Sequence, residues 1–158
     1  TPLRSRVGHV FMKGALAEHG AVFGGEPSGH FYLRDNFNAD SGAIALARVL
    51  SIASSTETPM SELIAPIARY AQSGEINFEN EDKDNTLEEL IAEYADRGTI
   101  DELDGVTLDC FNDEGWWANI RKSNTEPLLR LNLEAKAKEL LDRMVAEIAP
   151  KLGTQVDH

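Results

Sequence analysis

The sequence predicts a two-part α/β protein: an α/β unit with helices on a mixed sheet, then an α+β unit with two helices covering an antiparallel sheet. Three observations predict it. Helical spacing alternates with short apolar runs over residues 1–71, whereas alternating apolar and polar residues dominate residues 75–158. The small polar segment Gln72-Ser73-Gly74 between them is the best candidate linker. We therefore expect domains at 1–71 and 75–158.

The first part begins with a predicted helix and a short strand. Apolar residues at helical spacing predict the helix over residues 8–18, and the pair His19-Gly20 is a C-cap that ends it. The apolar run 21–23 predicts a strand, which Gly24-Gly25 stops.

Two further helices are predicted in the first part. Asp40 or Ser41 can cap a helix with an apolar face formed by Ile44, Ala47 and Leu50. A third helix starts at Pro59, because proline favours the first helical position, and continues through Ile67.

The second part is predicted to run strand, helix, three strands, helix. The segment Thr86-Leu-Glu-Glu89 is a capping box at the start of the first helix, and Gly98 closes the apolar stripe behind it. Alternation predicts strands over residues 106–110, 116–120 and 129–133, with a turn at 112–115. The last helix spans residues 137–148, where six apolar residues share one face.

The composition excludes several classes of protein. The chain has 158 residues, a formal net charge of −12 and one cysteine, Cys110. The negative charge disfavours nonspecific binding to nucleic acid or an anionic membrane. One cysteine excludes an internal disulfide framework and a zinc site built on several thiolates. With no membrane-length apolar run and no signal peptide, we expect a cytoplasmic protein without nucleic-acid or membrane partners; its oligomeric state stays open.

Charge is distributed unevenly along the chain. Residues 1–34 hold four cationic side chains against two carboxylates, whereas the rest carries a net charge of −14. Much of that negative charge lies between Glu75 and Asp104, a run that most simply forms a solvated surface. Local positive clusters are therefore where an anionic ligand is expected.

Arg121-Lys-Ser-Asn-Thr-Glu-Pro127 is a polar loop between two predicted strands. A phosphate is bound by a guanidinium, small hydroxyls and amide donors. Within five residues the loop offers Arg121, Ser123, Asn124 and Thr125. Arg130, on the polar face of the following strand, can reach the same anion. The same residue types form ordinary turns, so a structural turn remains the alternative.

Gly24-Gly-Glu-Pro-Ser-Gly-His30 is a second candidate loop. Glycines let the backbone approach a ligand, while the Glu26 carboxylate and the Ser28 hydroxyl can hydrogen-bond sugar hydroxyls. Nothing in this spacing is unique to sugars, and a structural turn is the alternative here too.

His9 follows Gly8 at a predicted helix start. The positive end of the helix dipole favours the neutral imidazole, which can accept a proton near pH 7. Lys13 lies one turn further on and can share the same face. A structural histidine is the alternative.

Together, the segments Val7-Gly-His9, 24–30 and 121–127 resemble the motifs of the α-D-phosphohexomutase superfamily, most closely those of its bacterial phosphomannomutase/phosphoglucomutase group. The resemblance spans essentially the whole chain, in the same order. It implies a C-terminal fragment: the later part of the third of four domains, with its sugar loop, and all of the fourth, TBP-like domain, with its phosphate loop. The phosphoserine and magnesium loops of the first two domains have no counterpart here.

The resemblance also implies an activity, for the full-length protein. It is an isomerase of carbohydrate metabolism, a phosphoprotein that interconverts hexose 6-phosphate and hexose 1-phosphate (mannose and/or glucose). The reaction uses Mg²⁺ and a hexose 1,6-bisphosphate intermediate, and the fragment alone is expected to be inactive. A non-catalytic sugar-phosphate-binding module is the alternative, as is phosphoglucosamine mutase, although Asn124 favours a neutral hexose phosphate. A third is an acidic interaction domain whose loops are only turns.

The resemblance implies roles for single residues as well. His9 is the candidate general acid or base. The residues expected to bind the sugar are Glu26, Ser28 and His30. The residues expected to bind the existing phosphate are Arg121, Ser123, Asn124, Thr125 and Arg130. No metal ligand is expected in this chain.

Overall fold

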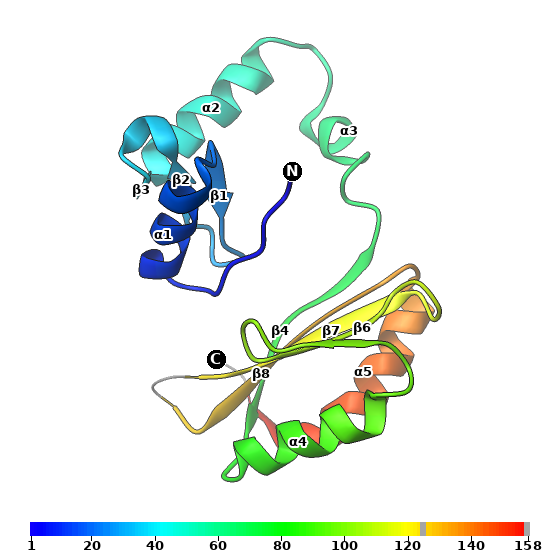
Figure 1. Cartoon of the computed structure of the whole chain (residues 1–158). Helices are drawn as coiled ribbons and strands as arrows, with labels where there is room; N and C mark the ends of the chain where they lie inside the picture. Colours follow the sequence, from blue (N-terminus) through cyan, green and yellow to red (C-terminus); the bar gives the residue numbers. More distant parts are fainter. Residues whose placement is uncertain (124–125, 157–158) are drawn as a thin grey trace. The chain divides into compact units, whose positions relative to one another are not determined.

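The computed structural model describes residues 1–123 and 126–156, and the chain forms two compact units, Thr1–Ala68 and Arg69–His158 (Figure 1). Each unit is described by itself. Two of the expected phosphate-binding residues, Asn124 and Thr125, lie outside the described residues.

The first unit combines three helices with a three-stranded sheet of order β1-β2-β3. Its elements are α1 (His9–His19), β1 (Phe23–Gly25), β2 (Phe31–Leu33), the short 3-10 helix η1 (Arg34–Asn36), β3 (Ala39–Asp40), α2 (Gly42–Ser54) and α3 (Met60–Ile64). Both strand pairs are antiparallel, so the expectation of a mixed sheet is wrong for this unit. Short connections join these strands, and only antiparallel neighbours can be joined that way.

The first strand lies two residues further along the chain than the predicted strand over residues 21–23. β1 starts at Phe23 and contains Gly24 and Gly25, which were expected to stop it. A Cβ at Gly24 would lie 2.8 Å from Leu16 Cδ1 and 2.9 Å from Met12 Cε. Glycine here leaves room for these two side-chain ends of α1 to pack against the strand, and it does not end the strand.

The predicted helix ends are mostly confirmed. Gly20 adopts the left-handed conformation after α1, and its N–H donates to the Leu16 carbonyl. Ser41, not Asp40, caps α2: its hydroxyl accepts from the Ile44 N–H at 3.3 Å. Pro59 is the N-cap of α3, one position before the predicted first helical position, and that helix ends at Ile64, short of Ile67.

The apolar core of the first unit is small. Its buried apolar side chains are Leu16, Tyr32 and Leu33. The apolar helix α2 has no buried residue, and Leu46, Val49, Leu50 and Ile52 are exposed by 47–59%. Contacts around β2 therefore carry most of the packing of this unit.

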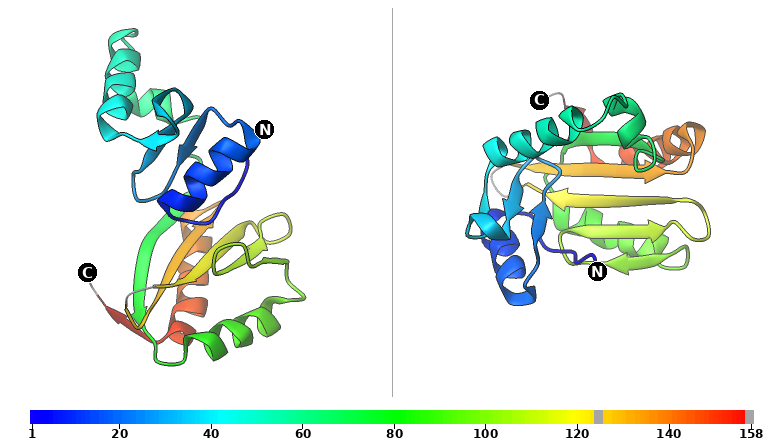
Figure 2. Two further views of the ribbon diagram at one scale, coloured as in Figure 1. Left: turned by 60° about the vertical axis from the view of Figure 1, so that its left-hand side comes forward. Right: turned by 90° about the horizontal axis from the view of Figure 1, so that it is seen from above.

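The second unit is an antiparallel sheet of order β5-β6-β7-β8-β4-β9 with α4 and α5 on one face (Figures 1 and 2). This confirms the predicted α+β architecture. Two short strands, β5 and β9, were not predicted. The elements are β4 (Ala71–Glu79), α4 (Lys83–Tyr94), β5 (Thr99–Asp101), β6 (Val106–Cys110), β7 (Trp116–Lys122), β8 (Leu128–Ala135), α5 (Lys138–Leu152) and β9 (Thr154–Val156).

The segment expected to be a linker lies within β4. Gln72-Ser73-Gly74 pairs with β8 around a bulge between Gln72 and Glu75, where Gly74 has a φ of 69°. The Ser73 hydroxyl accepts from the Leu133 N–H at 2.9 Å, replacing part of the interrupted ladder. Small polar residues here mark a β-bulge, not a flexible connection.

The helix α4 begins one turn earlier than predicted. It starts at Lys83 after Asp82, so Thr86 is inside the helix and the capping-box prediction is wrong. The Thr86 hydroxyl instead accepts from the Asn80 amide at 3.0 Å. The predicted apolar stripe is confirmed, because Leu87, Leu90 and Tyr94 are buried.

Period-two alternation divides the sheet into two different faces. On β7 and β8 one set of side chains lies in the core beneath the helices, including Trp116, Ile120 and Leu131. Cys110, at the end of β6, belongs to this core and is 1% exposed. The alternate residues of β7 and β8, Arg121 and Arg130 among them, lie on the face without helices.

No helix in the described part of the chain has the length and hydropathy of a membrane span; the longest, α5, has 15 residues.

Arg97 ties the end of α4 to α5 and to the β6–β7 turn. Its guanidinium donates to both Glu114 oxygens, at 2.9 and 2.7 Å, and to Glu147 at 2.6 Å. It also lies over the rings of Tyr94 and Trp116, 4.8 and 5.5 Å from their centroids. The hydrogen bonds from Arg97 and Trp116 lower the pKa of Glu114 from 4.5 to about 2.

We predict that Glu114→Gln destabilises the second unit by about 1.5–3 kcal/mol at pH 7, the range for hydrogen bonds to charged groups. Because folding lowers this pKa, the contribution is complete above about pH 4.5 and is lost as the pH falls towards 2. Urea unfolding at pH 7 and pH 3, followed by tryptophan fluorescence, measures it.

The variant should therefore lose less stability than the wild type between these two pH values. Asp142→Asn, which removes an exposed carboxylate on α5, is the control. An unchanged pH dependence in Glu114→Gln would contradict the assignment.

Candidate functional site

The turn joining β1 to β2 carries the first group of predicted site residues. The Glu26 N–H donates to the His30 carbonyl and the Gly29 N–H donates to the Glu26 carbonyl, both at 3.0 Å. Gly29 has a φ of 84°, a conformation that favours glycine. Ser28 is exposed at the tip, where its hydroxyl is accessible.

Glu26 faces inward from this turn. It is 8% exposed, and each carboxylate oxygen accepts one hydrogen bond. Oε1 accepts from the Tyr32 hydroxyl at 2.5 Å, and Oε2 accepts from the Gly8 N–H at 2.9 Å. A carboxylate has about four acceptor positions, so a sugar hydroxyl can still bind here. In this structure, however, Glu26 joins the turn to the start of α1.

His9 is the first residue of α1, as predicted. Its side chain is exposed, and its Nδ1 lies 2.7 Å from the Tyr32 hydroxyl oxygen. The preceding Gly8 has a φ of 121°, which a residue with a side chain rarely adopts. The bond from the Gly8 amide to Glu26 thus fixes where the helix begins, and with it the position of His9.

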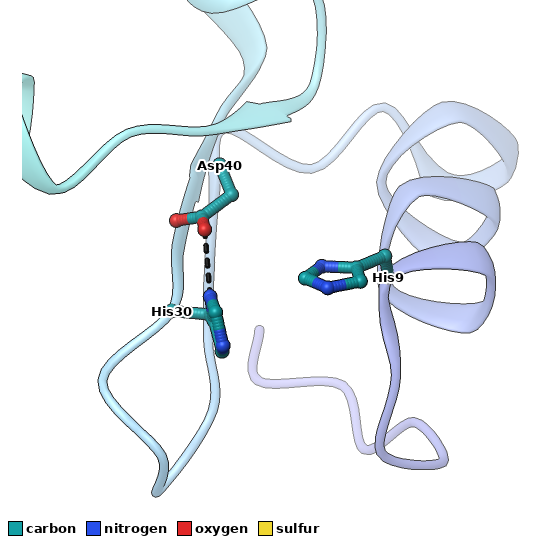
Figure 3. Close-up of side chains that lie close together, drawn as sticks. All are labelled: His9, His30 and Asp40. Carbon is teal, nitrogen blue, oxygen red and sulfur yellow. Dashed lines mark hydrogen bonds and ion pairs between the residues drawn. The ribbon is translucent and has the colours of Figure 1, made fainter.

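His30 is paired with a carboxylate. Its Nδ1 lies 2.6 Å from Asp40 Oδ2 (Figure 3). Asp40 Oδ1 accepts from the Phe31 N–H at 2.9 Å. The bond to Asp40 raises the pKa of His30 above its usual 6.5, and the same bond lowers the pKa of Asp40. Asp40 therefore orients the His30 ring through Nδ1, and the other ring nitrogen, Nε2, takes no part in this bond.

The two histidines come together from different elements. Their ring centroids are 4.9 Å apart at an interplanar angle of 81°, and His9 extends from the start of α1 towards His30 (Figure 3). The first unit thus brings together an exposed hydroxyl, a carboxylate and two imidazoles. Such a group can hydrogen-bond a polyol and transfer protons near neutral pH.

His9, His30 and Asp40 also lie close enough together to be candidate metal ligands. One ligand atom from each of His9, His30 and Asp40 lies within 4.8 Å of the others. Two imidazoles suit a transition metal, whereas Mg²⁺ prefers carboxylates, phosphate oxygens and water. These residues do not fit Mg²⁺, and the Asp40–His30 bond gives the carboxylate another role.

Arg121 and Arg130 form the centre of the second group. They are directly opposite each other on β7 and β8, on the face of the sheet without helices. Glu75, on β4, contacts both: its Oε2 is 3.4 Å from Arg121 and its Oε1 is 3.5 Å from Arg130. Arg130 also pairs with Glu126 at 3.3 Å. Among the described residues, the carboxylates paired with these two adjacent guanidiniums lie 3.3–3.5 Å from them.

Ser123 borders this group at the end of β7. Its N–H donates to the Leu128 carbonyl at 2.9 Å, and its hydroxyl is 3.5 Å from Glu126 Oε2. The Lys83 ammonium donates to the Glu126 carbonyl at 3.0 Å, which adds a third cation nearby. Arg130 Nε is buried without a hydrogen-bond partner among the described residues. This surface has the charge and donors that bind a phosphate dianion.

Three residues of these groups were not identified from the sequence. Asp40 was considered only as a helix cap, Tyr32 was given no role, and Glu75 was considered only as one residue of an acidic run. Tyr32 and Asp40 are partners in the β2–β3 register. Their proximity to His9 depends on strand pairing, which no local pattern reveals.

Two family models match the chain. The model described as phosphoglucomutase/phosphomannomutase, alpha/beta/alpha domain III, matches residues 1–70. The model described as phosphoglucomutase/phosphomannomutase, C-terminal domain, matches residues 75–151. Together they span nearly the whole chain.

Curated proteins and a solved structure give the same result. The chain is 40% identical to a phosphomannomutase of Methanocaldococcus jannaschii, over 92% of this chain and 32% of that protein. It is 36% identical to a phosphohexose mutase of Xanthomonas campestris, over 94% of this chain and 33% of that protein. A phosphoglucomutase/phosphomannomutase family protein of Burkholderia thailandensis superposes with a TM-score of 0.77 at 27% identity, covering 96% of this chain and 32% of that one. The chain spans about a third of the length of these relatives.

We predict that Asp40→Asn lowers the pKa of His30 towards its usual value of 6.5, because the carboxylate that stabilises the imidazolium is lost. A pH titration of the His30 ring protons by NMR measures the change. Asp35→Asn, at an exposed aspartate of the same unit, is the control and should leave the His30 titration unchanged. Identical curves for Asp40→Asn and the wild type would contradict the pairing.

Proposed function

The chain belongs to the phosphoglucomutase/phosphomannomutase family, and we propose that it is the substrate-binding C-terminal part of a phosphohexomutase. The proposed full-length enzyme interconverts hexose 6-phosphate and hexose 1-phosphate, with mannose and/or glucose as the sugar. The observation that carries this is the pair Arg121 and Arg130, side by side on β7 and β8, with carboxylate partners at 3.3–3.5 Å among the described residues.

The second unit supplies the proposed phosphate site. A phosphate dianion carries more charge than either Glu75 or Glu126 and accepts bidentate hydrogen bonds from a guanidinium, so it can displace these carboxylates. Ser123, Asn124 and Thr125 are the further donors that the sequence assigns. Such a site binds phosphate regardless of which sugar carbon carries it, as a mutase requires.

The first unit supplies the proposed sugar site. Ser28 and His30 are accessible from the turn, and Glu26 keeps acceptor positions beyond those used by Tyr32 and Gly8. One carboxylate and one hydroxyl can accept and donate hydrogen bonds to ring hydroxyls in either orientation of the sugar. This suits a bisphosphorylated sugar that must reverse its orientation in the site before the second phosphoryl transfer.

Proton transfer is assigned to the histidines. The hydroxyl that attacks a phosphoryl group must lose a proton, and the departing oxygen must gain one. His9 was the sequence-based candidate. The Asp40–His30 pair adds a second imidazole that Asp40 orients and whose pKa it raises. Mg²⁺ and a hexose 1,6-bisphosphate belong to the proposal for the full-length enzyme, as does a cytoplasmic location, and no step here depends on a metal bound by this chain.

Two alternatives are less well supported. A non-catalytic sugar-phosphate-binding module would use both loops but gives no reason for two histidines 4.9 Å apart, one of them paired with a carboxylate. Phosphoglucosamine mutase is not favoured, because the relatives reported above are named phosphomannomutase or phosphohexose mutase.

We predict that glucose 6-phosphate shifts the NMR amide signals of Ser123 and Glu126 in the 158-residue chain, and those of Ser28 and His30 as well. Arg121→Ala should weaken this binding at least about tenfold, or ~1.4 kcal/mol, because a charged bidentate donor is lost. Arg34→Ala, at a half-exposed arginine, is the control. The absence of saturable shifts at both loops would contradict the proposal. If glucose, which has no phosphate, shifted the Ser123 and Glu126 signals in the same way, the assignment of the phosphate site would be contradicted.

We predict that Glu75→Gln strengthens phosphate binding by about three- to tenfold, or ~1 kcal/mol, because it removes the carboxylate that pairs with both guanidiniums. The same titration measures it. Glu134→Gln, at a carboxylate of β8 that hydrogen-bonds Gln72 and Trp117, is the control. Weaker binding in Glu75→Gln would show that Glu75 positions the arginines rather than competing with the ligand.

A further inference from the structure

We propose that Tyr32 is a positioning residue that fixes the proton of His9 on Nδ1 and so leaves Nε2 as the nitrogen that accepts a proton. The inference deepens the proposed function, on which its consequence for catalysis rests. The hydrogen-bond geometry itself stands without any ligand.

The Tyr32 hydroxyl has one proton and two neighbours. It is 2.5 Å from Glu26 Oε1 and 2.7 Å from His9 Nδ1, both within hydrogen-bond distance. The Tyr32 side chain is fully buried, with 0% exposed, so water does not compete for either contact. One contact must use the hydroxyl proton and the other must use an oxygen lone pair.

The bonds to Glu26 decide which contact is which. Its Oε2 accepts from the Gly8 N–H at 2.9 Å, and its Oε1 accepts from the Tyr32 hydroxyl at 2.5 Å, so both carboxylate oxygens act as acceptors. The Tyr32 proton is therefore directed to Glu26. Burial, followed by the bond to Glu26, raises the pKa of Tyr32 to about 12, so the hydroxyl keeps its proton at neutral pH.

His9 must then donate to Tyr32. The oxygen lone pair of the phenol meets a protonated Nδ1, and in the neutral ring the lone pair is left on Nε2. The exposed imidazole at the start of α1 would otherwise choose its tautomer freely. Tyr32 is itself held in the central strand β2, opposite Gly24 on one side and Asp40 on the other, which makes it a rigid reference for the ring.

The two histidines are therefore held through the same ring nitrogen. His30 is held through Nδ1 by Asp40, and His9 is held through Nδ1 by Tyr32, so each has Nε2 available. A bound hexose would meet two proton-transfer groups with the same free nitrogen. That arrangement serves a reaction in which two different hydroxyls lose and gain protons in turn.

Long-range ¹H–¹⁵N NMR of the ligand-free 158-residue chain tests the proposal, because it identifies which ring nitrogen of His9 carries the proton. In spectra of the neutral imidazole, we expect Nδ1–H in the wild type. Tyr32→Phe removes only the hydroxyl oxygen and should shift His9 to the Nε2–H form. Tyr94→Phe removes another buried hydroxyl bonded to a carboxylate, in the second unit, and should leave His9 unchanged.

An Nε2–H signal for His9 in the wild type would overturn the proposal, whether or not Tyr32→Phe folds. An Nδ1–H signal retained in folded Tyr32→Phe would overturn it as well. Neither measurement involves hexose phosphate. Failure here is therefore distinct from failure of the proposed function, which would appear as a lack of ligand-induced shifts.

Discussion

The register between β7 and β8 determines both the core and the charged surface of the second unit. Trp116, Ile120 and their alternate neighbours face the helices only if Arg121 and Arg130 face the other way. A slip of one residue would place guanidiniums in the core and apolar side chains in water. Correct packing of the core therefore also produces the pair of arginines, and the proposed phosphate site needs no separate folding determinant.

The first unit is organised by polar contacts to a much greater degree. Its apolar core consists of a few side chains, while Glu26 connects the β1–β2 turn to Gly8 and, through Tyr32, to His9. Buried hydrogen bonds of this kind contribute little net stability but define one arrangement, because every alternative leaves a buried group unsatisfied. The residues nearest the proposed chemistry are thus also those that hold the unit in shape.

Local sequence patterns were sufficient for most elements and insufficient for the details of the site. The alternating strands, the α5 stripe and the Ser41 cap follow from residue spacing, which short-range geometry controls. The glycines of β1 and the bulge at Ser73-Gly74 were misjudged because close packing and ladder pairing involve residues distant in sequence. For the same reason the sequence identified His9 and Glu26 but not Tyr32, the residue that joins them.

The rate at which thiol reagents modify Cys110 can measure how often the second unit opens. Cys110 is the sole thiol of the chain, it lies in the core, and burial raises its pKa to about 11, so little thiolate exists in the folded state. Alkylating reagents can therefore modify it only during transient exposure of the sheet. The rate of labelling would report how often the core around Cys110 becomes exposed.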